Sequence, residues 1–229
     1  MLGKAALAMW WDVAPETRME LEHWHAHEHF PERLAIPGFL RGSRWTAVDD
    51  GEGFFVLYEL QDHAVLASAA YVARLNAPSP WSTRMMPLHR HMVRTQCKVV
   101  HSQGAVTARH ALTLRCSPLE ADAQSLQRGI VELAASVVQQ PGIVGQHLLR
   151  HEAPSLAVTT EQRIRGNADR AANWIVVACG YDLGALKQLA AQELGEAALQ
   201  TLGCAPGSAR HFFGLAYSAT PADVHWPVS

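Results

Sequence analysis

The sequence predicts an α+β protein in which two tandem ferredoxin-like βαββαβ repeats pack sheet to sheet as one intramolecular α+β barrel. The first observation is an internal repetition: residues 37–44 (PGFLRGSR) are answered by residues 141–148 (PGIVGQHL), and residues 54–66 (FFVLYELQDHAVL) by residues 174–186 (WIVVACGYDLGAL). The second is that the strands of both copies are almost continuously apolar. Such a repetition constrains the architecture more strongly than any single motif does.

The spacing between the two copies changes along the chain. Early landmarks lie 103 to 104 residues apart and later ones 120 apart, so the second copy contains about sixteen extra residues. They fall in the polar, loop-like stretch 152–171. We therefore expect a first repeat at residues 1–103 that holds the ligand pocket and a second, structural repeat at residues 104–229, linked by a turn at residues 101–104.

Each repeat has the order β-α-β-β-α-β. Strands are rich in β-branched and aromatic residues, and helices show apolar residues at a spacing of 3.6. The first repeat is expected to have strands at residues 4–11, 39–48, 53–60 and 93–101 and helices at residues 15–30 and 62–75. The second is expected to have strands at residues 106–115, 143–150, 173–179 and 209–218 and helices at residues 118–139 and 182–194. Asp62 and Asp182 stand where a helix needs a residue that caps its first N–H groups.

The strands indicate that both faces of each sheet are covered. The segments FFVLYEL, WIVVACGY and HFFGLAY show little alternation of polar and apolar residues. Strands with this pattern are usually buried on both sides. A ferredoxin-like repeat places its helices on one face of its sheet only. Packing the two sheets against each other covers the remaining faces and predicts the barrel.

Composition excludes several classes of function. Nineteen basic and twenty-one acidic residues give a net charge of −2 without a basic run, so we expect neither nucleic acid nor a membrane as a partner. Four widely spaced cysteines favour buried thiols in a reducing compartment, and the short apolar N-terminal stretch is a poor signal peptide, so we expect a cytoplasmic protein. Motifs for dinucleotide binding, ATP binding and serine hydrolysis are absent from the sequence.

The most specific motif is residues 23–45 (HWHAHEHFPERLAIPGFLRGSRW), a His-containing helix end followed by Pro-Gly and a strand. Together with the duplication, it resembles the dimeric α+β barrel superfamily and, within it, the EthD-like branch. The superfamily includes cofactor-independent monooxygenases, muconolactone-type isomerases and haem-degrading enzymes. The resemblance implies a ligand that binds between a sheet and its own helices.

Four histidines alternate in HWHAHEH. At 100° per residue, His23 and His27 share one side of the helix, and His25 and His29 share the other. A divalent metal would need His25, His29 and a third ligand, which the spacing permits but nothing in the sequence demands. Haem is the other cofactor alternative for this helix, although we expect no cofactor. The core-facing stripe of the helix is expected to contain Met19, Ala26, Phe30 and Leu34.

His29 is the strongest candidate for acid–base chemistry. It matches the His that EthD-like sequences carry nine residues before the Gly of the Pro-Gly, whereas the same offset from Gly142 reaches Leu133. An ionisable group in only one copy favours one active pocket. A His at this place suits enolisation, lactone isomerisation or deprotonation of a phenol. The alternative is that His29 caps the end of a helix that Pro31 terminates.

Glu32 and Arg33 complete the candidate catalytic set. Glu32, or alternatively Glu28, would orient the imidazole, and Arg33 would bind a carboxylate or enolate oxygen. The other interpretation is that these residues belong to a solvated helix face. Arg41 and Arg44 point to opposite faces of their strand, so only one can reach a helix-side pocket.

The Pro-rich segment 76–91 is expected to form a loop that covers the pocket or contacts another subunit. The candidate ligand-binding residues are Trp24, Arg41, Trp45, Tyr58 and Trp81.

We therefore expect a small-molecule-binding protein that performs acid–base, oxygenase or isomerase chemistry on a small apolar or aromatic compound. The alternatives are a non-catalytic ligand-binding or interaction protein, and a haem- or metal-binding protein. The fused repeats satisfy the barrel within one chain but do not forbid a homodimer.

Overall fold

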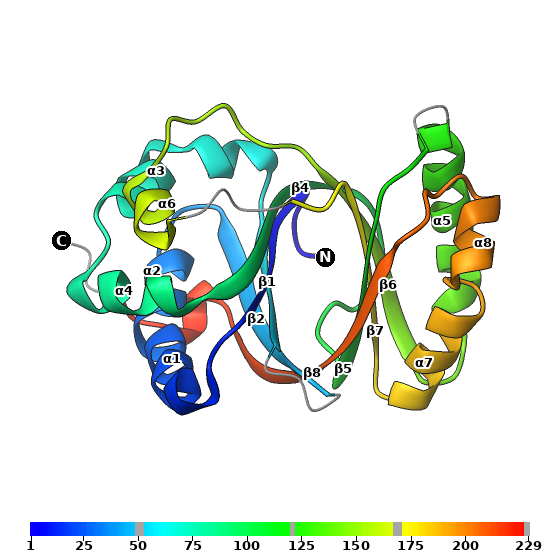
Figure 1. Ribbon diagram of the computed structural model, residues 1–229, viewed down its shortest axis with the longest axis horizontal. Coiled ribbons are helices and arrows are strands. Elements are labelled where there is room, and N and C mark those ends of the chain that lie inside the picture. The colour runs from blue at the N-terminus through cyan, green and yellow to red at the C-terminus, as the bar shows by residue number, and fades with distance from the viewer. Residues whose placement is uncertain (49–52, 120–121, 167–170, 227–229) are drawn as a thin grey trace.

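The computed structural model describes residues 1–48, 53–119, 122–166 and 171–226. Its centre is a closed antiparallel barrel in the order β1-β3-β2-β8-β5-β7-β6-β4, with helices on two opposite sides (Figure 1). The predicted α+β fold of two ferredoxin-like repeats is confirmed. The strands are β1 (Ala5–Asp12), β2 (Phe39–Ala47), β3 (Gly53–Leu60), β4 (Arg90–Gly104), β5 (His110–Cys116), β6 (Ile143–His151), β7 (Trp174–Gly180) and β8 (Ala209–Ala219).

The strand order repeats between the two halves of the chain. In the first half the neighbours run β4, β1, β3, β2, and in the second half β8, β5, β7, β6. Two antiparallel pairings join the halves: β2 with β8, as in Ser43 opposite Ser218, and β4 with β6, as in Ser102 opposite His147. Closure removes the free sheet edges that an open sheet would expose.

Hydrophobic side chains form three cores. One lies on the helical side of the first half, a second lies in the corresponding place of the second half, and a third fills the barrel. On β3, Val56 belongs to the first core and its neighbour Phe55 to the barrel core, and both are fully buried. The prediction that both faces of the strands are covered is confirmed.

The helices lie outside the barrel. Those of the first half are a 3-10 turn at Pro15–Thr17, α1 (Arg18–Trp24), a π-helical turn at His25–His29, α2 (Phe30–Leu34), a 3-10 turn at His63–Ala67, α3 (Ala69–Asn76), α4 (Pro80–Met85) and a 3-10 turn at Met86–Leu88. Those of the second half are α5 (Ala123–Val137), α6 (Thr160–Arg165), α7 (Leu183–Ala191), α8 (Glu196–Thr201) and a 3-10 turn at Pro221–Asp223. Within the described ranges, no helix is long and apolar enough to span a membrane.

The predicted caps are confirmed. Asp62 accepts a hydrogen bond from the backbone N–H of Ala64 at 2.8 Å, and Asp182 accepts one from Ala185 at 3.1 Å. Each carboxylate satisfies an N–H group that has no partner within its own helical segment.

The first helix does not end at Pro31, contrary to the prediction. The chain stays helical to Leu34, and before the proline the N–H of Phe30 donates to the carbonyl of His25, five residues earlier. A proline inside an α-helix loses one hydrogen bond and crowds the carbonyl four residues before it, and the wider π-helical turn relieves that crowding. His29 therefore lies inside the helix, and the helix-capping alternative for it is wrong.

The predicted core-facing stripe of this helix is partly wrong for the same reason. Phe30 and Leu34 are buried, but Met19 is 84% exposed. The π-helical turn adds a residue to one turn, so a spacing of 3.6 extrapolated back from Phe30 slips out of register. Leu21 and Trp24 take the buried positions instead.

Among the described residues, three α-helices lie outside the predicted helices. These are α4 within residues 76–91, α6 within residues 152–171, and α8 after α7; residues 167–170 lie outside the described residues. Strand β4 stays paired with β6 as far as Gly104 opposite Gly145, so the repeats are linked by residues 105–109 rather than 101–104.

The insertion of the second repeat crosses to the helices of the first. Residues 159–166, which we call the α6 strap, lie beside α3 on the left of Figure 1. The backbone N–H of Thr160 donates to the side chain of Asn76 at 3.0 Å, and the buried guanidinium of Arg33 donates to the carboxylate of Glu161. The strap is thus attached to the first repeat by a buried ion pair.

Replacement of Gly42 with alanine should loosen the contact between β2 and α2. A Cβ at this position would lie 2.4 Å from Cε1 of Phe30 and 2.9 Å from Cε1 of Tyr58, and both rings are buried. We expect Gly42→Ala to lower the free energy of unfolding by about 1–3 kcal/mol in urea titrations. The matched control is Gly214→Ala on β8, where the nearest atom would be Cγ1 of Val48 at 3.5 Å. Equal stability of the two variants would contradict the close approach.

The ion pair between Arg33 and Glu161 gives a second test. Glu161→Gln leaves a buried guanidinium that faces only Glu32, at 3.8 Å, and should lower the free energy of unfolding by about 3 kcal/mol. The exposed pair of Arg84 and Glu20 is the control, because Glu20→Gln should cost less than about 1 kcal/mol. Chemical unfolding of both variants measures the difference, and similar losses would mean that the strap is not held by this pair.

Candidate functional site

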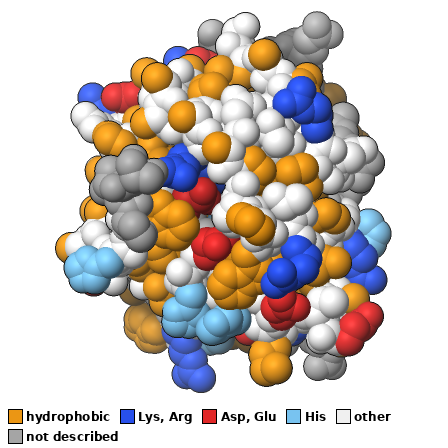
Figure 2. All heavy atoms as spheres, turned by 90° about the vertical axis from the view of Figure 1, so that its left-hand side faces the viewer, with side chains coloured by type: hydrophobic (Ala, Val, Ile, Leu, Met, Phe, Trp, Pro, Cys, Tyr) orange, Lys and Arg blue, Asp and Glu red, His pale blue; other side chains and the backbone are white. Residues whose placement is uncertain are grey.

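A small cavity lies between the strands β1, β3 and β4 and the helices of the first half. Its volume is about 40 Å³, which is room for a few water molecules. On the outer surface of this helical side, basic, acidic and hydrophobic side chains are interspersed without a broad patch of one charge (Figure 2). We call the space the helix-side cavity; it is lined by Leu7, Met9, Trp11, Trp24, His25, His29, Arg33, Tyr58, Tyr71, Met86, His89, Met92, Arg94, Glu161 and Arg165.

The three residues of the candidate catalytic set lie together. Nδ1 of His29 is 3.6 Å from Oε2 of Glu32, and Nη1 of Arg33 is 3.8 Å from the same oxygen. Glu32 and Arg33 are buried, and His29 is nearly so. Burial raises the pKa of Glu32, against the opposing effect of the Arg33 guanidinium. This arrangement lets the carboxyl group orient the imidazole through Nδ1 and leaves Nε2 on the other edge of the ring.

Both buried histidines are held in their neutral form. The predicted pairing is confirmed: the rings of His25 and His29 lie 5.4 Å apart, and those of His23 and His27 lie 4.5 Å apart. Burial, and then the nearby Arg33, lowers the pKa of His29 well below its ordinary value, and burial with Arg44 does the same for His25. A neutral imidazole can accept a proton at neutral pH.

The ring of Trp24 fixes the position of His29. The two rings lie 4.6 Å apart, and the indole Nε1 donates to Glu28 at 3.0 Å and to Ser82 at 3.2 Å. Ser79 also donates to the Glu28 carboxylate, so this network ties the π-helical turn to α4. Glu28 is therefore occupied by Trp24 and the two serines, and Glu32 is the carboxyl group that faces His29.

Buried polar atoms without a hydrogen-bond partner are concentrated around the cavity. An unsatisfied buried donor or acceptor is costly and calls for an explanation, such as a bound ligand or water. Five lining residues each contribute one such atom: Nε1 of Trp11, Nδ1 of His25, Nδ1 of His29, Nη1 of Arg33 and the hydroxyl of Tyr58. The cavity is therefore surrounded by hydrogen-bonding groups that are already desolvated.

The charges beside the cavity are organised by the α6 strap. Burial opposes the charge of Arg33, but the carboxylates of Glu161 and Glu32 outweigh it and raise the pKa of the guanidinium. Arg165, on the same strap, also lines the cavity and lies 3.7 Å from Glu161. The second repeat thus supplies side chains to a pocket of the first.

A larger cleft lies next to the cavity. Its volume is about 310 Å³, and Tyr71, Arg94 and Arg165 line both spaces. The guanidinium of Arg94 donates to the hydroxyl of Tyr71 at 2.7 Å. A ligand could therefore place a reactive group near His29 and its body in the cleft if these side chains turned aside.

Of the ligand-binding residues predicted from the sequence, some line the helix-side cavity and others lie elsewhere. Trp24 and Tyr58 line the helix-side cavity, and burial raises the pKa of the Tyr58 hydroxyl. Trp81 packs half-buried on the first core, with its ring 5.4 Å from that of His23, outside the cavity lining. The segment that contains Trp81, residues 76–91, does cover the cavity, but the residues that line the cavity are Met86 and His89.

Arg41 and Trp45 lie on the barrel side of β2, so the expectation that they line the pocket of His29 is wrong. A β-bulge between Phe39 and Arg41 shifts the register, which places Phe39 on the helix side and Arg41 against the buried carboxylate of Glu59, at 2.5 Å. Trp45 stacks on a barrel residue, Phe55. Only one of the two arginines reaches the helix side, as predicted: Arg44 donates to the carbonyl of Glu22 at 3.1 Å.

Several lining residues were missed from the sequence. Trp11, His89 and Arg94 belong to strands or turns where a single polar or aromatic residue gives no signal of its own. Glu161 and Arg165 lie in the insertion, and the extra length of the second copy was the signal that could have drawn attention to them. Leu133, the counterpart of His29 by sequence offset, packs half-buried against the second core.

The residues around the cavity do not fit a metal or haem centre. Among the residues that the structure describes, no three His, Cys, Asp or Glu side chains are grouped closely enough to hold a metal ion. His25 and His29 are a pair without a third ligand. The cavity itself, at about 40 Å³, holds neither a porphyrin nor a single aromatic ring, and either would need Tyr71, Arg94 and Arg165 to turn aside and join it to the cleft.

Comparison with known proteins shows the fold. No protein-family model and no curated protein matches the chain. Solved structures that resemble it include an anthrone oxidase-like protein, with 10% identity, a TM-score of 0.66 and coverage of 95% of this chain and 93% of that one. A candidate monooxygenase from Fusobacterium nucleatum has 11% identity, a TM-score of 0.62 and 96% coverage of both chains. One from Lactobacillus acidophilus has 11% identity, a TM-score of 0.59 and coverage of 95% and 97%.

These structures span nearly all of the chain, so the match includes both repeats and the closed barrel. The EthD-like branch suggested by residues 23–45 stays a prediction. The chain has the dimeric α+β barrel fold in the form in which two ferredoxin-like repeats are fused in one polypeptide.

Proposed function

We propose that the protein is an acid–base enzyme that removes a proton from a small phenol or enolisable aromatic ketone in the helix-side cavity. The observation that carries the proposal is the ring of five desolvated, unpartnered polar atoms around one cavity, which includes a neutral imidazole and a buried guanidinium. Such groups are costly to maintain and are concentrated at functional sites.

In the proposed step, Nε2 of His29 accepts the proton. The O–H or C–H bond of the substrate breaks, an N–H bond forms on the imidazole, and the electron pair remains on the substrate as a phenolate or enolate. Glu32 acts as a positioning residue, because it faces Nδ1 and favours the tautomer that leaves Nε2 free to accept. Nη1 of Arg33 would donate to the anionic oxygen.

The surroundings suit an aromatic substrate. Trp24 and Tyr58 line the cavity, and the substrate ring would occupy the joined cavity and cleft once Tyr71, Arg94 or Arg165 moves. An electron-rich enolate or phenolate can react with molecular oxygen without a cofactor; anthrone plus O₂, for example, gives anthraquinone plus water. The solved structure of an anthrone oxidase-like protein has the same fold, which makes anthrone a reasonable first probe.

Replacement of His29 should abolish proton removal without unfolding the protein. We expect His29→Gln to lower the rate of deuterium exchange at the anthrone methylene under nitrogen by about 100-fold or more, and to lower oxygen consumption in air equally. The matched control is His27→Gln, on the exposed side of the same π-helical turn, which should retain full activity. Anthrone that binds but exchanges at the same rate with both variants would instead identify a non-catalytic binding protein.

The pH dependence gives an independent test. Because the pKa of His29 is lowered, the base remains unprotonated at pH values where an ordinary His is protonated. Activity should therefore persist at pH 6 and be lost only as the pH falls through the lowered pKa. The acid limb of kcat/KM and an NMR titration of the His29 ring should agree. A limb at or above about pH 6.5 would contradict a buried, neutral His29 as the proton acceptor.

A further inference from the structure

The two ends of the barrel differ. At one end the N-terminus fills the opening: the Met1 ammonium donates to Ser102 at 2.5 Å, and the N–H of Leu2 donates to Glu59 at 2.6 Å. At the opposite end, the described residues line a cavity of about 480 Å³, which is the size of many small-molecule sites. We call this space the barrel mouth. The interior of an eight-stranded barrel is just wide enough for side chains or for one small ligand, and here the third core fills it up to the mouth.

The floor of the barrel mouth is a fixed aromatic surface. The ring of Trp10 stacks on Phe55 at 5.0 Å, and Phe55 stacks on Trp45 at 5.1 Å. The Trp10 indole also donates to Thr113 at 3.1 Å, so it cannot rotate freely. Phe213 borders the same cavity. Phe55 stacks on the Trp10 ring and the Arg115 guanidinium lies over it, so an aromatic ligand would pack against this rigid floor beside Arg115, at little cost in side-chain entropy.

One wall of the mouth is basic. The guanidinium of Arg115 lies 5.0 Å from the centre of the Trp10 ring, and its Nη2 is 3.3 Å from Nε2 of His211. Since the guanidinium can only donate, His211 accepts and is neutral at Nε2, consistent with burial and Arg115 lowering its pKa. The planar guanidinium and a ring N–H suit a carboxylate.

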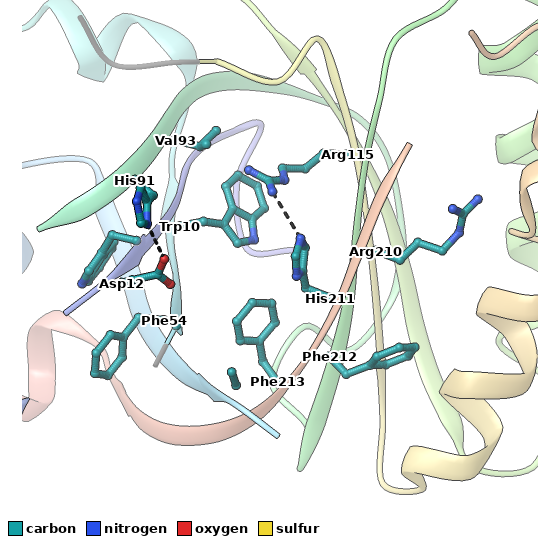
Figure 3. A pocket seen from close by; sticks show the side chains of 13 residues that line it. Trp10, Asp12, Phe54, His91, Val93, Arg115, Arg210, His211, Phe212 and Phe213 are labelled. Atoms are coloured by element: carbon teal, nitrogen blue, oxygen red, sulfur yellow. Dashed lines mark hydrogen bonds and ion pairs between the residues drawn. The ribbon is translucent and has the colours of Figure 1, made fainter. Parts of the chain in front are cut away.

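The other side of the mouth carries a carboxylate. Oδ2 of Asp12 is 2.8 Å from Nδ1 of His91, which has φ of +54°, a rare backbone conformation for a residue other than glycine. In Figure 3, Asp12 and His91 lie on one side of the mouth and Arg115 and His211 on the other, with Trp10 between them. Arg210, which also borders this space, turns away and binds Glu196 at 3.3 Å.

We propose that the barrel mouth is a binding site for a single-ring aromatic carboxylate that carries a hydroxyl or amino group on the far side of its ring. The carboxylate binds Arg115 and His211, the ring packs against the aromatic floor beside Arg115, and the donor at the opposite end faces Asp12. The polarity of the two walls sets this orientation, because a carboxylate near Asp12 would be repelled. The site is separate from the helix-side cavity and does not depend on the proposed activity there.

The test uses 4-hydroxybenzoate as the probe, titrated into the full chain by calorimetry and tryptophan fluorescence. We expect saturable binding with quenching, and a loss of affinity of at least about tenfold in Arg115→Gln. Arg210→Gln, at the same rim but bound to Glu196, should bind within about twofold of the unmodified chain. His29→Gln should also bind normally, which separates this site from the helix-side cavity. 4-Hydroxybenzyl alcohol, which lacks the carboxylate, should bind at least about tenfold more weakly.

Circular dichroism checks that the variants fold, and Arg115→Lys is the second variant if Arg115→Gln does not. Lysine keeps the positive charge but lacks the planar guanidinium. The affinity of Arg115→Lys for 4-hydroxybenzoate should therefore lie between those of the unmodified chain and Arg115→Gln. Absence of saturable binding to the unmodified chain, equal affinity in Arg115→Gln, or loss of binding in His29→Gln would each overturn the proposal.

Discussion

Closure of the barrel is the constraint on which the rest of the structure depends. Strands β1 and β3 are apolar on both sides, so the first half cannot leave one sheet face in water without exposing a large hydrophobic surface. The pairings of β2 with β8 and β4 with β6 solve this by turning both inner faces toward one shared core. Because residues of both halves form this core, the sheet of the first half is buried only when the second half packs against it.

The strict alternation of side chains along β1 separates two chemical environments. Trp10 faces the barrel and forms the floor of its mouth, whereas Trp11 faces the helices and contacts His25, with ring centres 5.7 Å apart. Both indoles border the barrel mouth, and Trp11 also borders the helix-side cavity. Strand β1 is therefore the wall that the two spaces share.

Most of the fold could be predicted from the sequence, because repetition and continuous apolarity report directly on strand order and burial. The pairing of His25 with His29 was also predictable, because residues four apart lie on the same side of a helix. Local irregularities were not predictable. One bulge at Arg41 sends that side chain into the barrel, and one π-helical turn carries the helix past Pro31. Each changes the register by a single residue, and neither leaves a pattern in the chain.

The site also depends on a contact that only the folded chain creates. Burying Arg33 beside His29 requires a compensating carboxylate, and Glu32 alone lies 3.8 Å away, too far for a hydrogen bond. Glu161 comes from the other repeat, and it fits because the insertion crosses the barrel wall to reach α2 and α3. Burial beside this strap lowers the pKa of His29 and favours the neutral imidazole. One repeat thus contains the ionisable cavity, and the other supplies the strap that covers it.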